Sequence, residues 1–181
     1  MILRCFRSSS HPSTIRALYG TIVAQARCAT FYSGYGVPDT VQGRFDLIVL
    51  HLVLVLDRLG RDNGAGRSVG QELFDVFCGD LEDNLREMGV GDLAVPKRMR
   101  RFGEAFYGRQ AAYLAAFTAA DERELEKALV RNIFAGADDD RGAARLARYA
   151  RAALRQFEVQ EEGALLRGKV CFPEPEAIQH G

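Results

Sequence analysis

The sequence predicts an all-α protein that folds as one bundle of about six helices. Apolar residues recur along most of the 181-residue chain with the spacing of one helix face, and no segment alternates convincingly like a half-buried strand. Hydrophobic residues make up 48% of the chain and charged residues 27%, as in an ordinary globular domain. We expect one helical domain at residues 13–166, a short N-terminal extension at 1–12 and an irregular C-terminal tail at 167–181.

The first two expected helices cover residues 14–29 and 41–59, and a turn rich in glycine and aromatic residues separates them. Asp39 or Thr40 is placed to cap the second helix, because both side chains accept hydrogen bonds from free backbone N–H groups. This helix contains the most apolar segment of the chain, residues 47–56. A membrane span needs about 20 apolar residues, so we expect a helix buried at the centre of the bundle instead.

The third expected helix covers residues 68–88, with leucine and phenylalanine every four residues, an acidic outer face and Gly89 placed to end it. The fourth covers residues 96–117 and begins near Pro96, because proline is tolerated in the first turn of a helix. Five side chains recur on it at about 100° per residue, which predicts core packing: Met99, Phe102, Phe106, Tyr113 and Phe117.

The fifth expected helix covers residues 121–134, and Asp121 and Glu124 have the spacing of a capping box. The sixth starts at three aspartates, residues 138–140, and ends near Phe157. One side of the sixth helix is apolar, and four arginines lie on the other: Arg145, Arg148, Arg151 and Arg155. Such a helix is either an ordinary member of the bundle or a face for an anionic membrane or an acidic partner.

The composition argues against several functional classes. The chain has 24 basic and 24 acidic residues, whereas a dedicated nucleic-acid binder is usually clearly basic. No nucleophile elbow, phosphate-binding loop or dinucleotide fingerprint is present. The three histidines are too few for a convincing metal site, and the four cysteines have no zinc-ligand spacing. We therefore expect a protein that is not an enzyme and that needs neither a metal nor a cofactor.

His51 interrupts the most apolar segment and allows two interpretations. In the first, it is a neutral histidine that is hydrogen-bonded inside the core. In the second, it is an axial ligand in a bundle that binds haem or another small ligand. Asp46 and Asp57 are near it in the sequence, but neither has the spacing that would place it beside His51 on a helix.

Three segments are more specific than these general patterns: residues 36–51, 74–99 and 102–109. Their order and spacing resemble the ubiquinol–cytochrome c chaperone family, which is found in bacteria and mitochondria. The resemblance runs from about Leu18 to the fifth expected helix. It implies a helical assembly factor for the cytochrome bc1 complex that binds nascent or immature cytochrome b, without catalysis. The arginine-rich composition and the near absence of a presequence suggest a bacterial member.

The resemblance also carries over motif positions, of which we expect the glycines and prolines, such as Pro38, Gly43 and Pro96, to be architectural. The other positions that we select would form a partner-binding surface or its supporting network: Asp39, Arg44, Asp92, Lys97, Arg98, Tyr107 and Arg109. Two alternatives remain open for this set. Asp39 would then only cap a helix, and Arg44 would pair with an acidic residue of the helix at 68–88.

The resemblance further implies where the protein works and with what. We expect it in the cytoplasm and at the cytoplasmic face of the inner membrane, or on the matrix side in a eukaryote. The ribosome and a small helper protein are further expected contacts. Independently of the resemblance, the basic faces of the fourth and sixth expected helices predict contact with an anionic membrane surface. A groove between helices would hold the client. The alternatives are a bundle that binds haem or a small ligand and a membrane-surface adaptor without specificity for cytochrome b.

Overall fold

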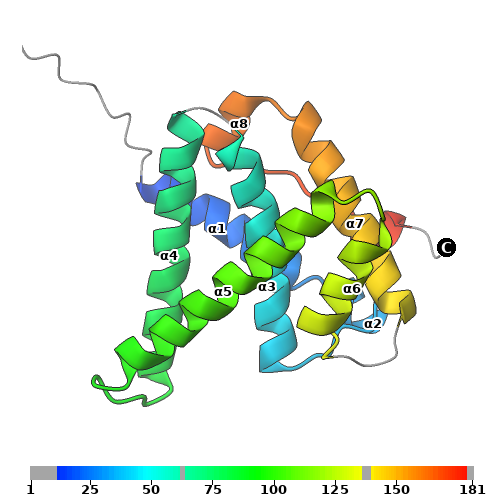
Figure 1. The fold of residues 1–181 in the computed structure, drawn as a ribbon. Coiled ribbons are helices and arrows are strands. Elements are labelled where there is room, and N and C mark those ends of the chain that lie inside the picture. Colours follow the sequence, from blue (N-terminus) through cyan, green and yellow to red (C-terminus); the bar gives the residue numbers. More distant parts are fainter. Residues whose placement is uncertain (1–11, 62–63, 136–139, 179–181) are drawn as a thin grey trace, which may run out of the picture.

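Helix α3 (Val41–Gly60) forms the centre of the molecule, and other helices pack on it from several sides (Figure 1). The computed structural model describes residues 12–61, 64–135 and 140–178. These residues form helices and connecting segments but no strand, so the predicted all-α fold is confirmed. Four helices contact α3 directly: α1 (Pro12–Ala26), α4 (Ala65–Glu87), α5 (Val95–Thr118) and α7 (Asp140–Val159).

The remaining elements are shorter. Helix α6 (Arg123–Asn132) contacts both α5 and α7, and α8 (Glu162–Leu166) contacts α4. Helix α2 (Ala29–Ser33) contacts a 3-10 helix at Pro175–Ala177. All six expected helices are present in the described residues, with ends that differ by a few residues. Helices α2 and α8 were not expected, because five residues are too few to show a helical period.

The structure explains where two of the expected helices begin and end. Thr40, rather than Asp39, caps α3, because the backbone N–H of Gly43 donates to Thr40 Oγ1 over 3.0 Å. The first expected helix ends three residues earlier than expected, at Ala26, because the backbone of Cys28 is extended, with φ of −54° and ψ of 127°. That extended residue ends the helical run after α1 and turns the chain into α2.

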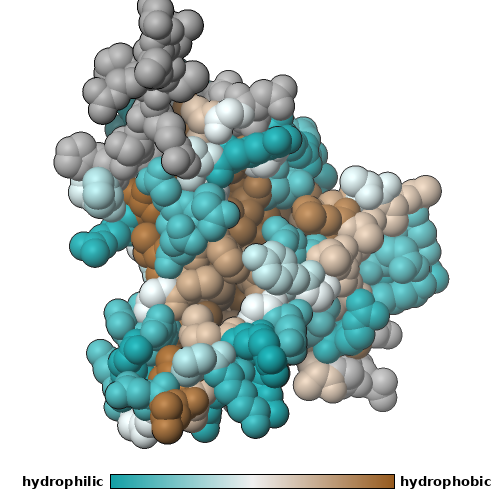
Figure 2. Space-filling model, turned by 60° about the vertical axis from the view of Figure 1, so that its left-hand side comes forward, coloured by the Kyte–Doolittle hydropathy of each residue, from teal (hydrophilic) through white to brown (hydrophobic). Residues whose placement is uncertain are grey.

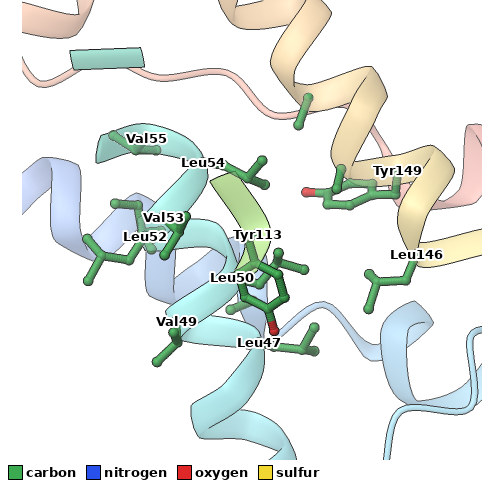
Figure 3. Close-up of a cluster of buried hydrophobic side chains, with 14 of the residues drawn as sticks. Leu47, Val49, Leu50, Leu52, Val53, Leu54, Val55, Tyr113, Leu146 and Tyr149 are labelled. Atoms are coloured by element: carbon green, nitrogen blue, oxygen red, sulfur yellow. The ribbon is translucent and has the colours of Figure 1, made fainter. Parts of the chain in front are cut away.

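The core confirms the interpretation of His51 as a neutral, hydrogen-bonded residue. Its side chain is fully buried; Nδ1 lies 2.7 Å from the carbonyl oxygen of Leu47 and Nε2 lies 3.0 Å from the hydroxyl of Tyr149. Gln25 in turn donates to that hydroxyl over 3.0 Å. Figure 3 shows Tyr149 reaching from α7 toward α3. Burial lowers the pKa of His51 to about 4, so Nδ1 donates its proton to Leu47 and Nε2 accepts from Tyr149.

The described part of the expected tail, residues 167–178, is mostly without helix but packs against the core. The ring centroids of Phe172 and His51 are 5.3 Å apart, and Tyr35 donates a hydrogen bond of 2.8 Å to the carbonyl oxygen of Pro175. Gln25 also donates to the carbonyl oxygen of Pro173 over 3.2 Å. This segment therefore covers one end of the His51 cluster. Residues 1–11, most of the expected N-terminal extension, lie outside the described residues.

Substitution of Gly43 tests the close contact at the start of α3. A Cβ at Gly43 would clash with the carbonyl oxygen of Pro38, so we expect Gly43→Ala to lower the free energy of unfolding by about 1–3 kcal/mol. Gly108→Ala is the matched control, because a Cβ there meets nothing within 4 Å. We expect that variant to gain about 0.5–1 kcal/mol, as alanine favours helix. Urea unfolding measures both, and equal effects would contradict the clash.

The buried His51 predicts a dependence of stability on pH. The unfolded chain binds a proton at His51 below pH about 6.5, whereas the folded chain does not until pH about 4. Unfolding therefore takes up a proton in this window, and lowering the pH from 7 to 5 should remove about 2 kcal/mol of stability. The measurement is urea unfolding followed by helical circular dichroism. His51→Gln should flatten this dependence, and an unchanged slope in that variant would refute the prediction.

Candidate partner-binding surface

A groove with mostly apolar walls opens between α1, α3, α4 and the beginning of α5, with a volume of about 290 Å³. We call it the apolar groove. Val41 and Met88 are 84% and 67% exposed, so large apolar surface here faces solvent. The other lining side chains come from all four helices: Tyr19, Arg27, Gln42, Arg44, Phe45, Ile48, Phe77, Asp80, Leu81, Asn84, Leu85 and Phe102.

A second groove of about 340 Å³ adjoins it along the contact between α3 and α5. We call it the arginine groove, and its lining residues are Gln42, Phe45, Arg98, Arg101, Phe102, Ala105 and Arg109. Gln42, Phe45 and Phe102 line both grooves, so the two form one continuous surface. A larger hollow of about 840 Å³ lies on α6 and contains none of the predicted site residues.

Apolar side chains also reach the surface on a wider scale. Figure 2 turns the α4 side of the molecule toward the reader and shows a band of apolar side chains bordered by hydrophilic ones. Leu93, in the turn between α4 and α5, is fully exposed. Contiguous apolar surface of this kind usually marks a site of interaction with another molecule.

A buried ion pair joins α3 to α5 beside the arginine groove. Nη2 of Arg109 lies 2.9 Å from Oδ1 of Asp46, whose side chain is 4% exposed. Gln42 donates to both carboxylate oxygens over 3.0 Å. Burial raises the pKa of Asp46, while Gln42 and Arg109 act in the opposite direction by stabilising the carboxylate. Arg109 therefore supports the site from within more than it contacts a partner.

The structure changes the interpretation of the Asp39 and Arg44 positions. Arg44 Nε lies 2.7 Å from Asp39 Oδ1, and both side chains are more than half exposed. This ion pair lowers the pKa of Asp39. The alternatives that Asp39 caps α3 and that Arg44 pairs with an acidic residue of α4 are therefore wrong, since Thr40 is the cap and Asp39 is the partner of Arg44. Arg44 lines the apolar groove.

The other predicted positions are divided between different surfaces. Arg98 is exposed and lines the arginine groove, whereas Asp92, Lys97 and Tyr107 are exposed but line neither groove. Tyr107 packs against Phe74 in a separate hollow, with 5.9 Å between the ring centroids. The structure thus brings Arg44, Arg98 and Arg109 together. The sequence analysis did not identify the apolar residues that form the wall of the apolar groove. Those residues range from buried Phe77 and Leu85 to exposed Val41 and Met88, and no periodic pattern distinguishes them from ordinary core or surface positions.

The predicted basic face of α7 is wrong at Arg145, which is only 6% exposed. Its guanidinium lies 4.2 Å from the ring centroid of Tyr35 and donates to the carbonyl oxygens of Gly34 and Ile178 over 3.0 and 3.1 Å. The reason is that the segment after α2 and the C-terminal segment cover this side of the helix. Arg148 and Arg155 are exposed, and Arg151 is half-buried, with a hydrogen bond of 3.4 Å to the carbonyl oxygen of Glu122.

The described residues contain neither a metal-binding cluster nor a membrane-spanning helix. They contain no group of three or more His, Cys, Asp and Glu side chains that could hold a metal ion. In residues 12–178, apart from the two internal gaps, no helix is long and apolar enough to cross a membrane. Both ring nitrogens of His51 are hydrogen-bonded, so a haem iron at Nε2 would have to displace Tyr149.

Comparisons with known proteins give a consistent result. The sequence matches the family described as ubiquinol-cytochrome C chaperone over residues 33–172. The ubiquinol-cytochrome-c reductase complex assembly factor 1 of Xenopus laevis is 26% identical over 157 residues, which are 86% of this chain and 78% of that protein. Its Homo sapiens counterpart is 24% identical over 157 residues, or 86% of this chain. The chain spans 52% of the human protein, about half its length.

A solved structure shares the whole arrangement of helices. The crystal structure of the Cbp3 homolog from Brucella abortus superposes with a TM-score of 0.86 at 36% sequence identity. The match covers 99% of this chain and 100% of that one. The similarity therefore includes the helices that form both grooves.

Two arginines of α5 that line the arginine groove, Arg98 and Arg109, are predicted to have different roles. Removing Arg109 leaves Asp46 buried without its cation, so Arg109→Gln should lower the free energy of unfolding by about 2–4 kcal/mol. Arg98→Gln is the control, because Arg98 is exposed and should change stability by less than about 0.5 kcal/mol. Urea unfolding of the two variants makes the comparison. If Arg109→Gln were as stable as Arg98→Gln, the buried pair would not support the site.

Proposed function

Because the chain belongs to the ubiquinol–cytochrome c chaperone family and is an assembly chaperone of the bc1 complex, we propose that its client is nascent or immature cytochrome b. The family assignment confirms the resemblance seen in the sequence. The proposed activity is binding, not catalysis. The client would be held until the complex is assembled, with the ribosome or a small helper protein as a further partner. The cytoplasmic face of the inner membrane, or the matrix face in a mitochondrion, would be the place of action.

The apolar groove is the observation that carries this proposal. A chaperone for an incomplete client has to cover apolar segments that lack their final partners. The groove offers an open apolar wall formed by four helices, and Val41 and Met88 project from it with most of their surface exposed. A segment that covered these side chains would gain hydrophobic free energy of about 25 cal/mol per Å² of buried apolar area.

The polar margin of the groove suits reversible binding. Asp80 and Asn84 on α4 and Gln42 and Arg44 on α3 surround the apolar wall. Tyr19 donates to Asp80 over 2.8 Å, so this margin is partly fixed by contacts within the chain. Interfaces between partners that separate again are less apolar as a whole than permanent ones, and their polar rim stays accessible to water. Release is required here, because an assembly factor must surrender its client to the complex.

Charge at the apolar groove should strongly reduce client binding without unfolding the protein. We expect the double variant Val41→Asp with Met88→Lys to retain about one fifth or less of the cytochrome b recovered with the parent chain, because apolar contacts are lost. Both positions are exposed helix ends, where these charges agree with the helix dipole. The measurement is affinity purification of the tagged chain from gently solubilised native membranes, with cytochrome b quantified.

Val159→Asp is the matched control, since Val159 is also 84% exposed but lies at the end of α7 and lines neither groove. It should recover as much cytochrome b as the parent chain. Full recovery with the double variant would show that the apolar groove is not the binding site. No cytochrome b with the folded parent chain would overturn the proposed client itself.

A further inference from the structure

The arginine groove carries positive charge that the protein does not neutralise. Arg98 and Arg101 are exposed, and neither has an ion-pair partner among the described residues. Arg109 is the third arginine of the groove, and its charge is balanced by Asp46. Gln42 also donates to both carboxylate oxygens of Asp46, so these oxygens already have hydrogen-bond partners within the protein. The groove therefore presents two free guanidinium groups to anything that enters it.

The sequence places these groups on one line along α5. Positions 98, 101, 105 and 109 follow the three- and four-residue spacing of a single helix face. The other lining residues add no carboxylate: Gln42 is an amide, and Phe45, Phe102 and Ala105 are apolar. Asp39 and Arg44 neutralise each other beyond the edge of this groove. The charge that faces the groove is consequently positive from α5 and neutral from α3.

Two aromatic rings connect this charge to the apolar groove. Phe45 and Phe102 line both grooves, and their ring centroids are 5.4 Å apart. A chain segment that lies in the apolar groove and continues over these rings reaches Arg98 and Arg101 next. The apolar groove and the arginine groove together therefore suit a single ligand that is apolar along most of its length and anionic at one end.

We infer that the client segment held in the apolar groove carries an aspartate or glutamate side chain at the end that enters the arginine groove, where Arg98 and Arg101 bind its carboxylate. This inference rests on the proposed function and adds a specificity determinant to it. A guanidinium group can donate two parallel hydrogen bonds to a carboxylate, which fixes direction as well as charge. The pair would thereby set the register of the client in the groove.

A peptide segment fits this surface better than an anionic lipid. The margin of the apolar groove presents Gln42, Asn84 and Asp80, whose amide and carboxylate groups can hydrogen-bond to a peptide backbone. Asp80 would repel the phosphate of a lipid that entered from that side. The acidic residues Glu82, Asp83 and Glu87 also lie on α4, the helix that forms this margin.

The test uses overlapping synthetic peptides that cover the cytochrome b of the source organism and the folded full chain. We expect the peptides that bind most tightly to contain an acidic residue beside an apolar run. Replacing that residue by its amide should weaken binding about fivefold to tenfold. The double variant Arg98→Gln with Arg101→Gln should weaken the acidic peptide by the same factor and leave the amide peptide unchanged.

Arg100→Gln is the matched control, because Arg100 is on the same helix, lies 3.7 Å from Glu104 and lines neither groove. It should bind both peptides as the parent chain does. The inference is overturned if the amide and acidic peptides bind equally well, or if the double variant keeps the parent affinity. It is also overturned if vesicles of phosphatidylcholine and phosphatidylserine, and no peptide, require the two arginines. Failure of the proposed function looks different, since neither peptides nor full-length cytochrome b would then bind the parent chain.

Discussion

The burial of α3 is the constraint on which the rest of the structure depends. Every side chain from Val49 to Val55 is buried, so neighbouring helices have to cover this helix on all its sides (Figure 3). His51 is the polar residue within this stretch, and its ring nitrogens are hydrogen-bonded to the carbonyl oxygen of Leu47 and to the hydroxyl of Tyr149 on α7. A helix without a solvent face sets the positions of its neighbours, because each of them must present an apolar side to it.

The candidate site lies where this burial ends. Toward its N-terminus, α3 is no longer completely buried, and Val41, Phe45 and Ile48 are partly accessible to solvent. Asp46 lies in the same stretch but points inward, and a buried carboxylate requires a cation. Arg109 supplies it from α5, which fixes the helix that carries Arg98 and Arg101 against α3. The grooves are therefore held in place by the charge pair that lies beneath them.

The sequence was sufficient to predict the central helix but not the arrangement of the candidate site. The run LIVLHLVLVL is too apolar for a surface helix and too short for a membrane span, and these two limits leave a buried helix. Helical spacing places Arg98 and Arg109 on the same flank of α5, yet one is exposed and the other is paired inside. The two arginines differ because Asp46, on α3, lies within reach of Arg109 at the contact between α3 and α5. Likewise, Arg145 is buried by the segment after α2 and by the C-terminal segment, neither of which has a periodic pattern that would predict it.

The contacts of residues 171–178 affect how the protein is made. Gln25 is hydrogen-bonded to Pro173, 148 positions away, and Tyr35 to Pro175, 140 positions away. Phe172 covers His51 from the same segment. Contacts so distant in sequence form slowly, since a long loop must close before they contribute. During translation the N-terminal helices therefore remain without this cover until these residues leave the ribosome, and the core around His51 is completed only then.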